Sequence, residues 1–183
     1  MIIISAHADT NYKRVHLRID DDEYVGFLDN YAGVYTAMKT FFSGEVNSEN
    51  VRIELTPDEE IDMRGAKEVA KEVRRDDLVV VIDVTGTETE KDFIIEKCKS
   101  AKVRNFVNST LKEFSYDIYE GCPDPVSDMD EIEVYKLKTD YYFFLGIPCR
   151  GGDYNFSETR CRIRSIDEAS KALIEICRNY ERF

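Results

Sequence analysis

Two adjacent carboxylates, Glu59 and Glu60, stand in the stretch LTPDEEID at residues 55–62. A β-branched run, VRIEL, precedes them and an amphipathic helix pattern, MRGAKEVAKEV, follows them, so the pair is predicted to lie between a buried strand and a helix. Neighbouring side chains in extended backbone point to opposite sides. One glutamate could then bind a metal ion while the other faces a water molecule, as metal-assisted hydrolysis requires. The alternative is an acidic helix start that suits the helix dipole.

Three other predicted strand ends carry further candidate residues. His7 follows the first apolar strand, and Asp9 is placed to hold the second ring nitrogen of His7. Asp29 follows a predicted hairpin and could cap the next helix or bridge two metal ions, and Asp83 ends the most apolar run of the chain. Each residue alone has a structural explanation. Because ligands of open α/β sheets gather at strand ends, the four positions together predict a metal site.

The elements that would position these residues follow from hydrophobic periodicity. The pattern predicts a hairpin over VHLRID and DDEYVGFL, and then a helix from about residue 30 whose core face is formed by Val34, Ala37, Met38, Phe41 and Phe42. Further along, it predicts strands in KDFIIEKC, SYDIYEG, GIPCR and TRCRIR, and helices in SAKVRNFVNSTLKEF, TDYYFFL and SIDEASKALIEICRNY. Ser165 is predicted to cap the last helix. No repeat or linker divides the chain, so residues 1–183 are expected to form one α/β domain.

Composition limits the partners. The net charge of −12 argues against nucleic-acid binding and against an anionic membrane surface. No apolar run approaches the ~20 residues of a membrane span, and the start of the sequence lacks a secretory pattern. Five scattered cysteines without a CxxC motif are typical of reduced thiols, so a cytoplasmic location is expected.

Five segments in order carry a resemblance to a known family: HADT, FLDNYAG, TPDEEIDMRGAK, LVVVIDVT and GIPCR. Together they resemble the co-catalytic metallo-aminopeptidases, and within them the glutamyl and tetrahedral aminopeptidase branch. LDNxxG and the EEIDxRGAK-like stretch are the specific part. The resemblance implies a zinc-exopeptidase-like fold, a three-layer sandwich with a central mixed β-sheet flanked by helices. It also implies divalent metal ions, zinc or manganese or cobalt, with one or two per chain.

The same resemblance implies a role for each candidate residue. His7 and Asp83 would bind one metal ion, Glu60 would bind the second, and Asp29 would bridge the two ions. A carboxylate bridge suits two cations roughly 3.5–4 Å apart.

The two remaining residues would be catalytic. Glu59 would act as the general base and Asp9 would orient the histidine. The implied substrate is a peptide or an aminoacyl compound.

Two departures from the family pattern stand out. Family members place a last histidine after the GIP strand, where this chain has GGDYNFSE, so Asp153 is the predicted replacement, with Tyr154 or Asn155 as alternatives. An oxygen ligand there would favour a harder metal ion than zinc, or the second metal could be absent. The branch also carries a separate β-rich domain between the residues matching Asp9 and Asp29, where this chain has only the hairpin, so an open site is expected.

These observations leave three hypotheses for function. The first is a metal-dependent amide hydrolase, most specifically an aminopeptidase. The second is a degenerate family member that serves as a binding or regulatory module. The third keeps the chemistry but cleaves N-acyl amino acids, whose carboxylate could be held by arginines of the last two strands, namely Arg150, Arg160, Arg162 and Arg164. The oligomeric state is not predicted.

Overall fold

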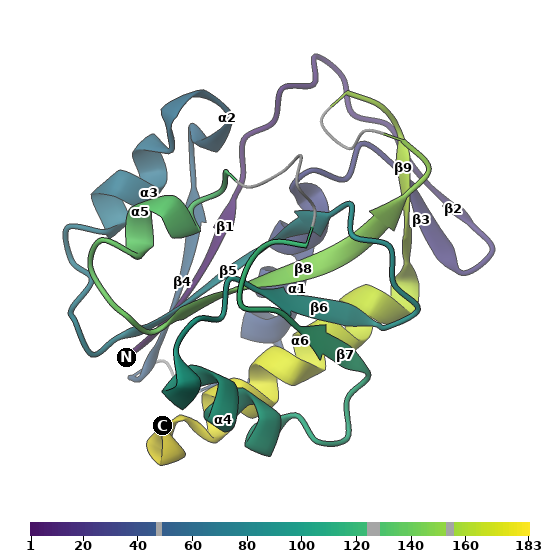
Figure 1. The fold of residues 1–183 in the computed structure, drawn as a ribbon. Helices are drawn as coiled ribbons and strands as arrows, with labels where there is room; N and C mark the ends of the chain where they lie inside the picture. The colour runs from purple at the N-terminus through teal and green to yellow at the C-terminus, as the bar shows by residue number, and fades with distance from the viewer. Residues whose placement is uncertain (47–48, 124–128, 153–155) are drawn as a thin grey trace.

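A mixed β-sheet lies at the centre of the molecule (Figure 1). The structure is a computed structural model that describes residues 1–46, 49–123, 129–152 and 156–183. The described residues form nine strands, which are β1 (Ile2–His7), β2 (Leu17–Asp20), β3 (Glu23–Gly26), β4 (Val51–Thr56), β5 (Leu78–Thr85), β6 (Phe93–Glu96), β7 (Tyr116–Ile118), β8 (Tyr142–Arg150) and β9 (Thr159–Arg162). The main strand order is β2-β3-β9-β8-β5-β1-β4, and β6 joins β7 to β8.

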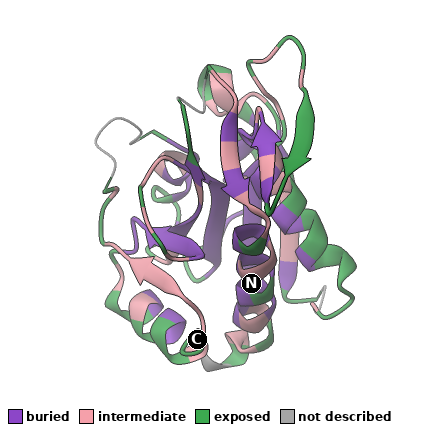
Figure 2. Ribbon diagram, turned by 90° about the vertical axis from the view of Figure 1, so that its right-hand side faces the viewer, coloured by how far each residue is buried: buried purple, intermediate pink, exposed green. Residues whose placement is uncertain are grey.

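The central strands are parallel and buried on both faces. β1 pairs in parallel with β4 and with β5, and β5 pairs in parallel with β8. Every residue of β1 and of β5 is buried, as expected for apolar strands covered by helices (Figure 2). By contrast, β2 at the outer edge is exposed along its whole length. The hairpin of β2 and β3 is antiparallel, as predicted.

Helices cover both faces of the sheet and make a three-layer sandwich, which confirms the predicted fold class (Figure 1). One layer holds α1, α4 and α6, and the opposite layer holds α3 and α5 with their own apolar cluster. The helices are α1 (Tyr31–Phe42), α2 (Glu59–Asp62), α3 (Arg64–Val69), α4 (Ala101–Thr110), α5 (Ile132–Tyr135), α6 (Ile163–Arg178) and the 3₁₀ turn η1 (Tyr180–Arg182). Every helix of the described chain is too short or too polar to cross a bilayer.

The predicted core face of α1 is confirmed for Val34 and Ala37 and wrong for Met38, Phe41 and Phe42. Phe41 and Phe42 are 54% and 72% exposed and Met38 is also exposed, whereas small residues of the helix are buried: Ala32, Gly33, Thr36, Ala37 and Thr40. Small side chains let the helix lie close to the sheet, since a Cβ at Gly33 would come within 2.7 Å of the Ile82 carbonyl oxygen. The aromatic side chains therefore point outward.

Two further predictions about elements are wrong. The run TDYYFFL is not a helix, because Tyr142 to Leu145 belong to β8, whose pairing with β5 supplies long-range bonds that the local pattern cannot reveal. Ser165 does not cap the last helix, because α6 already begins at Ile163 and Ser165 is buried inside it. No disulfide joins the five cysteines.

Candidate metal centre

The carboxyl ends of the parallel strands bring together side chains that are far apart in sequence. His7 is the last residue of β1. Asp83 lies two residues before the end of β5, because this strand continues to Thr85 and does not end at the aspartate as predicted. β4 ends directly before the turn that carries Glu59 and Glu60. The carboxyl ends of adjacent parallel strands lie at the same edge of a sheet, so the residues at these strand ends come together in one cluster.

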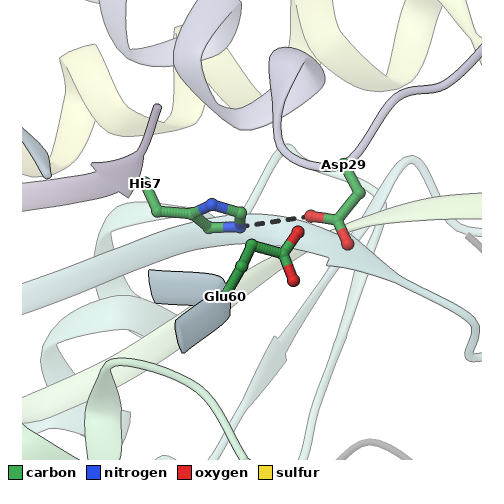
Figure 3. Close-up of side chains that lie close together, drawn as sticks. All are labelled: His7, Asp29 and Glu60. Atoms are coloured by element: carbon green, nitrogen blue, oxygen red, sulfur yellow. Dashed lines mark hydrogen bonds and ion pairs between the residues drawn. The ribbon is translucent and has the colours of Figure 1, made fainter. Parts of the chain in front are cut away.

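His7 is the centre of this cluster. Its Nε2 atom lies 3.1 Å from Asp29 Oδ1 and 3.1 Å from Asp83 Oδ2. His7, Asp29 and Glu60 each offer one ligand atom within 4.8 Å of the others, and Figure 3 shows the three side chains pointing toward one another. Imidazole and carboxylate oxygens are common ligands of zinc and other divalent transition metals.

The contacts of His7 fit a bound cation. A single ring nitrogen faces two carboxylates, although a neutral imidazole nitrogen can donate only one proton. Ligand atoms 2.0–2.1 Å from a tetrahedral metal ion lie about 3.3 Å apart, close to the observed spacing of Nε2 from both carboxylates. The other ring nitrogen, Nδ1, is buried without a hydrogen-bond partner, and its closest carboxylate oxygen, Asp9 Oδ1, is 3.6 Å away.

Without a cation, the cluster must hold protons instead. Burial alone would lower the pKa of His7, but the Asp83 and Asp29 carboxylates overcome that effect and raise the pKa to about 12. Burial raises the pKa of Asp83 well above its ordinary value, with Asp29 and Glu59 adding to the effect against the lowering by His7. A cluster that traps protons in this way is suited to exchange them for a metal ion.

Glu59 and Glu60 lie in the four-residue helix α2 and not in extended backbone, so their predicted opposite orientation by strand alternation does not apply. Asp9 fixes the start of α2, because its carboxylate accepts hydrogen bonds from the backbone amides of Glu59 at 3.1 Å and Glu60 at 3.4 Å. The Asn11 amide donates to Glu60 Oε2 at 2.6 Å, a contact that the sequence did not reveal.

Glu59 has an unusual titration. Burial, followed by the neighbouring carboxylates of Glu60 and Asp29, raises the pKa of Glu59 to about 7, although His7 lowers it. A carboxylate with a pKa near neutrality is suited to exchange protons at physiological pH.

Asp29 is not the cap of α1. That position belongs to Asn30, whose side chain accepts from the Gly33 amide at 2.9 Å and donates to the Ile82 carbonyl oxygen at 2.8 Å. The peptide bond between Asp29 and Asn30 is cis. With the capping task taken by its neighbour, the Asp29 carboxylate is left to face His7.

Some predicted residues fall elsewhere. Asp153 and its alternatives Tyr154 and Asn155 lie outside the described residues. His16, predicted to be a surface or packing residue, is exposed, and its Nδ1 is 3.9 Å from a Glu158 carboxylate oxygen.

The four arginines considered for a substrate carboxylate are held by the protein itself. Arg150 and Arg160 both bind Glu23, at 2.7 Å and 3.1 Å. Arg162 donates to backbone carbonyl oxygens of residues 90 and 91, and Arg164 binds the nearly buried Asp92 at 3.0 Å.

A buried carboxylate beneath the cluster was also missed. Glu131 is 1% exposed and accepts a hydrogen bond from Ser5 Oγ at 2.6 Å and another from Thr56 Oγ1. The sequence indicated only a polar loop here, since the position of α5 depends on long-range packing.

Comparison with known proteins identifies the fold. No protein-family model and no curated protein matches the sequence. Among solved structures, a TET aminopeptidase from a marine-sediment Thaumarchaeota archaeon has a TM-score of 0.72 and 14% identity, over 89% of this chain and 52% of that one. Aminopeptidase APDkam598 from Desulfurococcus kamchatkensis has a TM-score of 0.69 and 17% identity, over 89% and 50%. An M18-family aminopeptidase from Thermotoga maritima has a TM-score of 0.66 and 15% identity, over 88% and 48%. The chain thus spans about half the length of these proteins, and over that span it has the α/β fold of the TET and M18 aminopeptidases.

Proposed function

We propose that this chain is a metal-dependent amide hydrolase, most specifically an aminopeptidase. The observation that supports it is the convergence of His7, Asp29, Glu60 and Asp83 from four separate segments onto one edge of an aminopeptidase-like sheet. Carboxylates this close to one another must be neutralised by bound protons or by a cation. The fold alone would not support an activity, because one fold carries many functions.

Each residue of the cluster has a proposed task. His7, Asp29 and Asp83 would hold one divalent ion, and Glu60 together with Asp29 would hold a second. A cation in this place would polarise the scissile carbonyl group. Glu59 would accept the proton of the attacking water and deliver it to the leaving amine, a task open to a half-buried carboxylate beside the cluster. Asp9 would keep Glu59 and Glu60 in place through their backbone amides.

Hydrolysis of aminoacyl amides after incubation with zinc, manganese or cobalt tests the proposal. Metal-dependent turnover is expected, and Glu59→Gln should reduce kcat by at least about 10²-fold, the usual contribution of a general base. Glu68→Gln on α3 is a matched control, since Glu68 is an exposed glutamate paired with Lys71. Turnover that survives Glu59→Gln contradicts the assigned base.

A binding or regulatory module is the second candidate. It is favoured by one observation: only two histidines occur, and the exposed His16 is not part of the cluster. The two functions differ in stoichiometry and turnover. Elemental analysis showing two tightly bound ions supports the hydrolase, whereas at most one ion without hydrolysis supports the module.

The N-acyl amino acid hypothesis loses its structural basis. The arginines that would bind the substrate carboxylate are engaged by Glu23, Asp92 and backbone carbonyl groups. Comparison of aminoacyl amides with N-acyl amino acids tests this expectation, and aminoacyl amides should be the better substrates.

A further inference from the structure

Glu131 is a buried carboxylate whose hydrogen bonds come from hydroxyl groups. Its side chain is at the start of α5, and no lysine or arginine of the described chain pairs with it. Both carboxylate oxygens instead accept hydrogen bonds from hydroxyl groups, one from Ser5 and one from Thr56. Burying an unpaired carboxylate is costly, and hydroxyl donors offset only part of that cost. A charge retained in such a place calls for an explanation beyond packing.

The two hydroxyl groups belong to the strands that deliver the cluster. Ser5 precedes His7 by two residues on β1, so the two side chains lie on the same face of that strand. Thr56 is the register partner of His7 on β4 and stands three residues before Glu59. Glu131 therefore joins the ends of β1 and β4 at the level where the histidine and the two glutamates emerge.

The neighbours of Glu131 strengthen this connection. Tyr135, one turn further along α5, places its hydroxyl group 2.9 Å from Ser5 Oγ. Asp130, the residue before Glu131, forms a buried ion pair with Lys97 at 2.9 Å, directly after β6. The start of α5 is thus held against three strand ends at once.

We propose that Glu131 is a positioning residue of the metal centre: through Ser5 and Thr56 it sets the placement of His7 relative to Glu59 and Glu60. This inference rests on the proposed metal-binding function. It assigns Glu131 no contact with substrate and no ligand bond. Groups that hydrogen-bond directly to a metal ligand usually contribute 10–100-fold to metal affinity, and Glu131, which acts through Ser5 and Thr56, should contribute toward the lower end of that range.

Cobalt titration tests the proposal, because the visible absorption of bound Co²⁺ reports coordination geometry independently of activity. Glu131→Ala should weaken Co²⁺ binding about 10-fold and change the Co²⁺ spectrum. Glu131→Gln keeps the shape and one acceptor oxygen, while its amide NH2 group can donate to the other hydroxyl group, so it should retain the spectrum with a smaller loss of affinity. Asp92→Ala is the matched control, because Asp92 is also a buried carboxylate but lies before β6 and pairs with Arg164. The control should retain both spectrum and affinity.

The outcomes separate this inference from the function on which it rests. If the parent protein binds no Co²⁺, the metal centre itself is wrong and the inference falls with it. If the parent binds Co²⁺ and Glu131→Ala binds it with the same affinity and spectrum, only the positioning role is overturned. Should Glu131→Ala fail to fold, Thr56→Val gives the same test, since it removes one hydroxyl donor and preserves the shape of the side chain.

Discussion

At the scale of single residues, the cluster is organised by competition between protons and cations. Five carboxylates, those of Asp9, Asp29, Glu59, Glu60 and Asp83, stand near one imidazole. In the metal-free protein, the Asp83 and Asp29 carboxylates hold a proton on His7 against the effect of burial, and burial with repulsion from Glu60 and Asp29 raises the pKa of Glu59. Two predictions follow from the direction of those shifts.

Metal binding should release protons. Because the pKa of His7 is about 12 in the metal-free protein, the imidazole is protonated at pH 7 and must lose its proton to become a ligand. Calorimetric titration with Zn²⁺ in two buffers of different ionisation enthalpy should show the release of about one proton or more, and metal affinity should increase as the pH rises. Buffer-independent heats would contradict the role of His7.

Replacing the proposed base should stabilise the metal-free protein. With a pKa raised to about 7, folded Glu59 keeps a proton that the unfolded chain loses above about 4.5, so stability falls as the pH rises from 4.5 to 7 and stays reduced above. Glu59→Gln should therefore increase the free energy of unfolding at pH 8 by about 1–2 kcal/mol, less than the full shift because the side chain is partly solvated. Urea denaturation measures this change.

The control for that measurement is Glu68→Gln, which removes an exposed charge from α3 and should change stability by less than about 0.5 kcal/mol. A Glu59→Gln variant that is less stable than the parent at pH 8 would show that the carboxylate is not strained in the metal-free protein.

At the scale of elements, the sequence predicts strands better than helix faces. β1 and β5 were recognisable because buried parallel strands are continuously apolar, and their ends located His7 and Asp83. The buried face of α1 could be recognised only in part from the sequence, since this helix lies close to the sheet, buries small residues and leaves its aromatic residues outside.

The aromatic run of β8 has no clear period, so its pairing with β5 could not be predicted. The role of Glu131 depends on two hydrogen bonds across more than 70 residues of sequence, and no local pattern carries that information. The gathering of candidate ligands at strand ends is therefore predictable from sequence, whereas the buried hydrogen bonds of Glu131 beneath them are not.

Gly33→Ala tests how closely α1 lies against the sheet. The added Cβ would come within 2.1 Å of Asn30 Oδ1 and 2.7 Å of the Ile82 carbonyl oxygen, so the helix must shift. We expect a loss of about 1–3 kcal/mol in the free energy of unfolding and weaker metal binding, because Asn30 adjoins Asp29. Thermal denaturation and metal titration measure both effects.

Gly121→Ala is the matched control, as nothing lies within 4 Å of a Cβ at that position, and it should be close to neutral. Parental stability in Gly33→Ala would mean that α1 has room to move.

At the scale of the whole molecule, an acidic chain with a net charge of −12 contains a cluster whose charges repel one another in the folded state. A ligand that binds only the folded protein stabilises it by mass action, by about 2.7 kcal/mol at a concentration 100 times its Kd.

For a chain of this length, that stabilisation corresponds to an increase in Tm of about 5–10 °C. Differential scanning calorimetry with Zn²⁺, Mn²⁺ or Co²⁺, followed by chelator, should show this increase and its reversal. His7→Ala should reduce it, since His7 is a ligand of the first proposed ion and a member of the described cluster. An equal increase in His7→Ala would locate the bound ion elsewhere.

The hairpin at the rim of the sheet has a consequence for how such a chain can diversify. Between Asp9 and Asp29 the chain leaves the cluster, forms β2 and β3 at the far side of the strand order, and returns. Among the described strands β2 pairs with β3 only, and the exposed Asp21 lies at the tip of the hairpin. Additional sequence grafted at that tip would extend outward from an already exposed edge. Evolution could therefore lengthen or shorten this arm, and acquire or lose a whole appended module there, while the chemistry at the opposite strands stays in place.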